Sequence, residues 1–110
     1  MIEVLNESKQ VKLEVSIANQ IEHDISVGLA RQYGKSFTVI CDESGVVRID
    51  LGNGTELVYT VQIERQPIYK LVESLSGVIV QSGTPGDKDY FIDESVICIM
   101  DDCKDFINSK

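Results

Sequence analysis

The sequence has a single histidine, which removes most arrangements of catalytic side chains. His23 falls between Ile21 and Ile25, toward the polar side of a predicted helix, where a structural histidine exposed to solvent is expected. A Cys–His nucleophilic pair would require that residues distant in the sequence meet in the fold, which the sequence does not indicate. We therefore expect a protein that is not an enzyme.

Cysteine is scarce and odd in number, which is typical of reduced thiols rather than a disulfide framework. Cys98 and Cys103 are separated by four residues, whereas common zinc sites use a separation of two. Adding Cys41 and His23 gives no pair with the usual ligand spacing. Three inert thiols are therefore expected, without zinc.

Long apolar runs are absent, and the first seven residues lack a basic region followed by an apolar core. Neither a membrane span nor a secretion signal is predicted, so we expect a cytoplasmic protein. The glycine-rich segments 52–54 and 82–86 do not continue as phosphate-binding motifs, because neither ends in Lys-Ser or Lys-Thr nor follows a G-x-G-x-x-G pattern. Asp87 and Asp89 supply too few ligands for calcium, so no cofactor and no metal ion are expected.

Residues 36–64 show the clearest pattern that is present, an alternation of side chains with a period of two. Glu43-Ser44-Gly45 and Gly52-Asn53-Gly54 divide this segment into three parts. Such a pattern is typical of antiparallel strands joined by tight turns, with one face buried. One alternating set consists of Phe37, Val39, Cys41, Val47, Ile49, Leu51, Leu57, Tyr59, Val61 and Ile63.

Residues 16–33 have apolar side chains at spacings of three and four, which predicts an amphipathic helix across the apolar face of the sheet. Gly34 is the predicted stop signal of this helix. Residues 1–15 fit a strand or a helix. The apolar side chains of the predicted helix are Ala18, Ile21, Ile25 and Leu29.

The segment after residue 64 is predicted to contain a short helix from Pro67 to Leu75, ended by Gly77. Residues 78–80 are β-branched and predict a fourth strand, and residues 82–87 are predicted to form a loop.

The C-terminal segment has an apolar stripe at helical spacing from Ile92 to Ile107, with Ser95 or Asp93 available as the N-cap. A strand up to Met100 followed by a short helix is the alternative interpretation. The whole pattern predicts one α+β domain over residues 1–110, with an antiparallel sheet of four or five strands (the meander at 36–64) packed against two or three helices.

Negative charge is the strongest compositional feature, with a formal net charge of -8. The span 87–105 holds seven acidic residues against Lys88 and Lys104, and aromatic residues lie among them. Such a surface attracts a basic protein and repels nucleic acid and anionic lipid, so neither of those is expected as a partner. A solvated acidic surface that only maintains solubility is the competing interpretation. The candidate partner-binding residues are Asp87, Asp89, Asp93, Glu94, Asp101, Asp102, Asp105, Tyr90 and Phe91.

In its small size, acidity, reduced cysteines and lack of catalytic residues, the whole chain resembles bacterial immunity proteins, such as those of contact-dependent growth inhibition systems. The resemblance depends on the acid-rich span 87–105 and implies a cognate toxin partner, in many cases a nuclease with a basic cleft. It implies a non-enzymatic inhibitor, which we expect to be a monomer in the free state.

Two other functions stay open. The same acidic surface would suit an inhibitor or regulator of phage type that mimics nucleic acid and occupies the binding groove of an enzyme that acts on DNA or RNA. A small enzyme whose residues meet only in the folded chain is the third possibility. Its candidate residues are Cys41, His23, Tyr33, Tyr59 and Tyr69.

Overall fold

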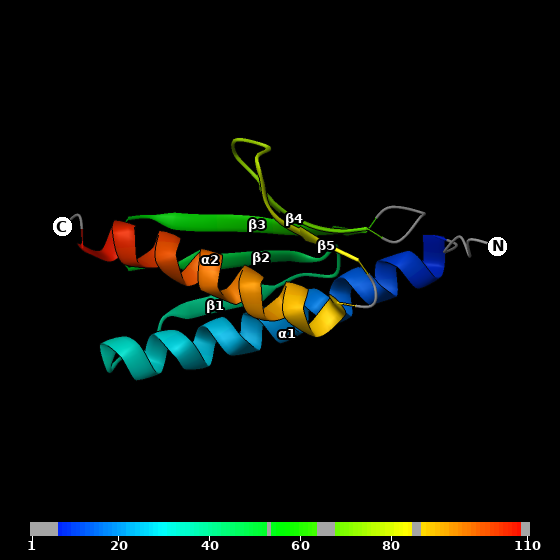
Figure 1. The fold of residues 1–110 in the computed structure, drawn as a ribbon. Coiled ribbons are helices and arrows are strands. Elements are labelled where there is room, and N and C mark those ends of the chain that lie inside the picture. The colour runs from blue at the N-terminus through cyan, green and yellow to red at the C-terminus, as the bar shows by residue number, and fades with distance from the viewer. Residues whose placement is uncertain (1–6, 53, 64–67, 85–86, 109–110) are drawn as a thin grey trace.

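The computed structural model describes residues 7–52, 54–63, 68–84 and 87–108, and shows a five-stranded antiparallel sheet with two helices on one face (Figure 1). The strands pair in the order β1-β2-β3-β4-β5, so each strand lies beside its neighbours in the sequence. This confirms the predicted α+β class and meander. In chain order the elements are α1 (Glu7–Tyr33), β1 (Thr38–Cys41), β2 (Val46–Asp50), β3 (Glu56–Ile63), β4 (Tyr69–Glu73), β5 (Ile79–Gly83) and α2 (Lys88–Asn108).

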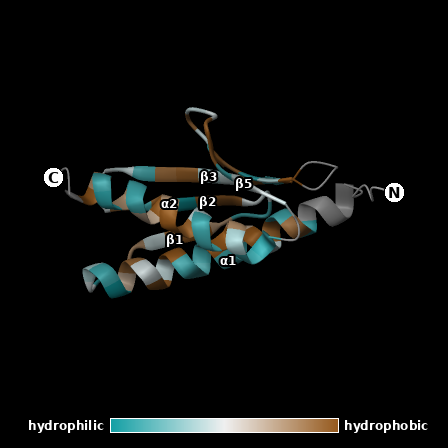
Figure 2. Cartoon of the chain, viewed as in Figure 1, coloured by the Kyte–Doolittle hydropathy of each residue, from teal (hydrophilic) through white to brown (hydrophobic). Residues whose placement is uncertain are grey.

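The core lies between the sheet and the two helices, where hydrophobic residues concentrate (Figure 2). The alternating side chains of the first three strands point to opposite faces of the sheet, as their period of two predicts. In β2, Val47 and Ile49 are buried, whereas the intervening Arg48 is exposed on the opposite face. Helix α1 packs on β1, β2 and β3, and α2 packs on β5 and β4. The helices also contact each other, and together they cover one face of the sheet (Figure 1).

Aspartate side chains shape the first two turns of the meander. Asp42 Oδ1 accepts hydrogen bonds from the backbone N–H groups of Ser44 (2.8 Å) and Val46 (3.3 Å), which lowers the pKa of the Asp42 carboxyl. Asp50 Oδ1 accepts one from Gly52 N at 2.8 Å, and Gly52 has a φ of 76°, a conformation that favours glycine. These local bonds fix the length of each turn and therefore the register of the strands.

Helix α1 begins at Glu7, nine residues before the predicted start, so the described part of the ambiguous N-terminal segment is helical; residues 1–6 lie outside the described residues. The extension allows Glu14 to accept a hydrogen bond from the backbone N–H of Ile63 at 2.8 Å, which joins α1 to the end of β3. Gly34 follows the helix with a φ of 69°, and its N–H donates to Ala30 O at 2.9 Å, as expected of a C-terminal stop.

The hydrogen bond from Ile63 of β3 to Glu14 of α1 can be tested by two substitutions of Glu14. Glu14→Ala is expected to lower the free energy of unfolding by about 1–2 kcal/mol, because the partly buried N–H of Ile63 loses the acceptor that Glu14 supplies. Glu14→Gln keeps an oxygen at the same position and should stay within about 0.5 kcal/mol of the parent. Chemical denaturation followed by circular dichroism measures both values. Equal destabilisation by the two variants would contradict the proposed role of the acceptor.

The predicted helix from Pro67 to Leu75 is wrong in the part that the structure describes, because Tyr69–Glu73 forms β4; Pro67 lies outside the described residues. The apolar residues of this segment fit helical spacing, but burial within β4 follows a period of two: Tyr69 and Leu71 are buried, whereas Lys70 and Val72 are only partly buried. Leu75 lies beyond the end of β4 and is 86% exposed. Pairing with the open edge of β3 decides the conformation. Gly77 therefore lies in a hairpin turn instead of ending a helix, with a φ of 72°.

The other differences concern the boundaries of β5 and α2. The predicted fourth strand is the fifth, β5, and it extends to Gly83, so the start of the predicted loop 82–87 belongs to the sheet; residues 85–86 lie outside the described residues. The C-terminal segment is one helix, which removes the alternative with a strand up to Met100. The predicted N-caps are wrong, because α2 begins at Lys88 and both Asp93 and Ser95 lie inside the helix.

Candidate functional site

The candidate residues of the span 87–105 lie on three sides of α2 rather than in one patch. Successive residues of a helix are rotated by 100°, so carboxylates that are close in the sequence can face different neighbours. Asp89 and Asp93 line a cleft beside α1, whereas Asp102 contacts β3. Asp87 precedes the helix, is exposed, and accepts a hydrogen bond from Thr84 Oγ1 at 3.1 Å.

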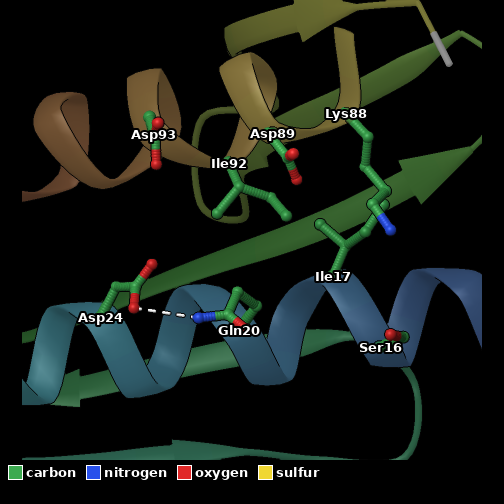
Figure 3. A pocket seen from close by; sticks show the side chains of 8 residues that line it. All are labelled: Ser16, Ile17, Gln20, Asp24, Lys88, Asp89, Ile92 and Asp93. Carbon is green, nitrogen blue, oxygen red and sulfur yellow. Dashed lines mark hydrogen bonds between the residues drawn. The ribbon is translucent and has the colours of Figure 1, made fainter. Parts of the chain in front are cut away.

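The cleft between α1 and the first turns of α2 has a volume of about 410 Å³ (Figure 3). Its floor includes Ile17 and Ile92, which are nearly fully buried. Asp24 reaches it from α1 and accepts a hydrogen bond from Gln20 Nε2 at 3.0 Å (Figure 3). The lining residues are Ser16, Ile17, Gln20 and Asp24 of α1, with Lys88, Asp89, Ile92 and Asp93 of α2.

The charge of this cleft favours a cationic group. Its lining contains three carboxylates, those of Asp24, Asp89 and Asp93, against the single ammonium of Lys88. Within the described ranges, no group of three or more His, Cys, Asp or Glu side chains is arranged to hold a metal ion. A basic side chain of another protein, which needs only nearby carboxylates and not a fixed coordination shell, suits this geometry better than a bound metal ion.

The solvent side of α2 carries three further carboxylates, those of Glu94, Asp101 and Asp105, together with Tyr90 and Ile97. We call these five residues the outer ridge. Tyr90 is 62% exposed and Ile97 is 53% exposed, and these two apolar side chains lie two helical turns apart. Asp101 and Asp105 are exposed, and their spacing of four places them one above the other. The outer ridge therefore combines exposed apolar area with negative charge.

Asp102 lies on the third side of α2, which faces the sheet. The hydroxyl of Tyr59, which is fully buried on β3, donates to Asp102 Oδ2 at 2.6 Å. Burial, followed by this bond to the carboxylate, raises the pKa of the Tyr59 hydroxyl far above its ordinary value. The pair fixes the C-terminal half of α2 to the sheet, and the two residues are 43 positions apart, so no local sequence signal predicts it.

The prediction that Phe91 belongs to the partner-binding surface is wrong. Its side chain is fully buried, and its ring centroid lies 5.5 Å from that of Tyr69 in a tilted arrangement. Gly83 of β5 permits this approach, because a β-carbon at that position would lie 3.3 Å from Phe91 Cβ. Phe91 is therefore a core residue, and Tyr90 is the exposed aromatic residue beside it.

The thiols occupy environments that disfavour reactive thiolates. Cys103 is fully buried, and burial, followed by the charge of Asp102, raises the pKa of its thiol to about 12. Cys98 also has a raised pKa, because of burial and then the neighbouring carboxylates of α2. Burial is likewise the main cause of the raised pKa of Cys41 at the end of β1. Nucleophilic thiols need a lowered pKa, so these three environments do not favour that chemistry.

The other residues named for a possible enzyme are dispersed. His23 is exposed on α1, and Tyr33 packs edge-to-face on Phe37 with ring centroids 5.9 Å apart. Tyr69 is buried against Phe91. Sequence reasoning missed the contribution of α1 to the cleft, above all Asp24, because the pairing of two distant helices leaves no pattern in a single sequence.

No protein-family model, curated protein or solved structure matches this chain. In the part of the chain that the structure describes, neither helix is long and apolar enough to cross a membrane. The functional assignment consequently depends on the surfaces of α2.

Proposed function

We propose that this chain is a non-enzymatic inhibitor of the immunity type, which neutralises a basic toxin domain by binding it through the outer ridge and the adjoining cleft. The observation that carries the proposal is the arrangement of α2: exposed Tyr90 and Ile97 lie among carboxylates on its solvent side, and Asp89 and Asp93 continue the negative charge into the cleft. Carboxylates accelerate the encounter with a basic partner, and exposed apolar side chains supply area that is buried in the complex.

The competing interpretation, that acidic residues only maintain solubility, accounts for charge but not for the two large apolar side chains on the same ridge. Isolated exposed apolar residues are common, so the pairing of these side chains with clustered charge is what favours an interface. The cytoplasm is the compartment in which such an inhibitor would meet its toxin, and a monomer would suffice for binding.

A growth assay tests the proposal in the cell. The C-terminal domain encoded by the reading frame next to this gene would be expressed alone and together with this protein. We expect growth arrest by the domain alone and restored growth on co-expression. A harmless domain, or toxicity that this protein does not relieve, would contradict the immunity function.

Charge-matched variants test the proposed surface once that complex is available. Asp101→Asn/Asp105→Asn is expected to slow association by about 5–10-fold at low salt, with a smaller difference at high salt, because exposed charges act on the encounter and are screened. Glu43→Gln/Asp50→Asn removes the same charge from the β1–β2 turn and the open face of the sheet, and should change the rate less than about twofold. Surface plasmon resonance gives both rates. Equal slowing by the two variants would remove the outer ridge from the interface.

A further inference from the structure

A second concave surface lies on the side of α2 that faces the sheet, near its C-terminal end. We call it the hairpin groove; it has a volume of about 490 Å³ and lies between β3, the β4–β5 hairpin and α2. The hairpin bends away from the helices at this point, and its projecting part is largely hydrophobic (Figures 1 and 2). The groove residues used below are Leu57, Tyr59, Glu73, Leu75, Asp102 and Phe106.

The apolar wall of the hairpin groove is accessible to solvent. Leu75, at the tip of the hairpin, is 86% exposed, and Phe106, on the last turns of α2, is 43% exposed. Leu57 and Tyr59 are buried and form the floor of the groove. The hairpin tip is held by local bonds: Glu73 accepts hydrogen bonds from the backbone N–H groups of Leu75 (3.3 Å) and Ser76 (2.7 Å). The groove is therefore built by a fixed turn and not by a chance gap between side chains.

The charge of the hairpin groove is entirely negative. Its lining includes three carboxylates, those of Glu56, Glu73 and Asp102, and no lysine, arginine or histidine among the described residues that line it. Glu56 is paired with Arg48 at 3.4 Å on the exposed face of the sheet, so Glu73 and Asp102 are left as the acidic groups of the interior. The hydrogen bonds of the turn, first those from Ser76, lower the pKa of the Glu73 carboxyl.

Asp102 has unused capacity to accept hydrogen bonds. Its Oδ2 atom accepts the bond from Tyr59, whereas Oδ1 has no hydrogen-bond partner among the described residues. A carboxylate offers about four acceptor sites on its two oxygens, and a planar guanidinium can donate to a carboxylate from a fixed fork of N–H groups. Since Tyr59 holds the Asp102 side chain in place, the orientation of Oδ1 is set before any ligand binds.

We propose that the hairpin groove receives an arginine side chain of the basic partner protein. The aliphatic part of the arginine would lie against Leu75, the guanidinium would stack on Phe106, and its N–H groups would donate to Asp102. The assignment deepens the proposed function, on which it rests. It adds a specific anchoring position to the electrostatic surface on the other sides of α2.

Small arginine derivatives test the groove without the partner. The full chain, labelled with ¹⁵N, would be titrated with N-acetyl-arginine amide and, in parallel, with N-acetyl-citrulline amide, a neutral molecule of nearly the same shape. We expect the arginine derivative to shift the amide signals of residues 54–59, 73–76 and 102–106 at millimolar concentration, and the citrulline derivative to bind about tenfold more weakly, because a hydrogen bond to a charged group is lost. Equal binding of the two molecules would overturn the proposal.

A matched pair of variants locates the binding site. Asp102→Asn keeps an acceptor for Tyr59 but removes the charge, and we expect about tenfold weaker binding of the arginine derivative. Glu43→Gln removes the same charge from the exposed β1–β2 turn, away from the groove and the cleft, and should leave this affinity within about twofold. Shifts confined to residues 16–24 and 88–93 would place the ligand in the cleft between α1 and α2 and overturn the assignment. Groove signals that shift with protein concentration alone would indicate a second copy of the chain as the occupant and would also overturn it.

The outcome separates this inference from the proposed function. Growth rescue together with a groove that does not bind arginine would overturn the groove assignment and leave the immunity function standing. Arginine binding in the groove without any toxic partner would overturn the immunity function and leave an arginine-binding groove.

Discussion

Replacing Phe91 with alanine is expected to lower the free energy of unfolding by about 3–5 kcal/mol, whereas Tyr90→Ala should change it by less than about 0.5 kcal/mol. The side chain of Phe91 is fully buried against Tyr69, and its removal leaves a cavity between α2 and the sheet. Tyr90 is 62% exposed, so its removal costs little packing. Chemical denaturation of both variants at neutral pH, followed by circular dichroism, measures the difference.

The same pair separates stability from binding. If the proposed complex with a basic toxin domain forms, Tyr90→Ala is expected to weaken it through faster dissociation, because aromatic side chains at an interface contribute buried area. Phe91→Leu keeps most of the buried volume and should recover more than half of the stability lost in the alanine variant. If the two alanine variants had equal stability, the orientation of α2 about its axis described here would be contradicted.

The regular part of the fold could be predicted because it depends on local patterns. Alternation over residues 36–64 and the glycine turns identified three strands, since one buried face and short turns leave few other conformations. The segment from Tyr69 to Glu73 could not be assigned in the same way. Its apolar residues suit a helix or a strand, and the choice is made by the edge of β3, which lies in another part of the sequence.

The candidate site was predictable in composition but not in geometry. The sequence identified the acid-rich segment, and helical rotation then distributes its carboxylates over three sides of α2. Phe91 and Tyr90 are adjacent in the sequence, and only the packing of α2 on β5 decides which ring is buried. Asp24 lines the cleft and Tyr59 bonds to Asp102 because elements distant in the sequence pack together. A single sequence does not record such contacts.

Because of Tyr59, the free energy of unfolding is expected to fall above about pH 10, by up to about 1.4 kcal/mol per pH unit. In the unfolded chain a tyrosine loses its proton near the ordinary pKa of 10.0, whereas burial and the bond to Asp102 raise the pKa of Tyr59 in the folded chain. Between these two values the folded state binds more protons than the unfolded state. The free energy of unfolding therefore decreases as the pH rises through this window and is unaffected by Tyr59 below it.

Tyr59→Phe isolates this contribution from those of the other groups that titrate in alkali. The variant loses the hydrogen bond to Asp102 and should be about 1–2 kcal/mol less stable than the parent at pH 7. Phenylalanine has no proton to lose, so the unfolded variant gains nothing from alkali at this position, and the two stability curves should converge as the pH rises from 9 to 11. Urea denaturation at a series of pH values measures the difference directly. Parallel curves would show that Tyr59 titrates alike in both states, which contradicts the burial and the hydrogen bond that fasten α2 to β3.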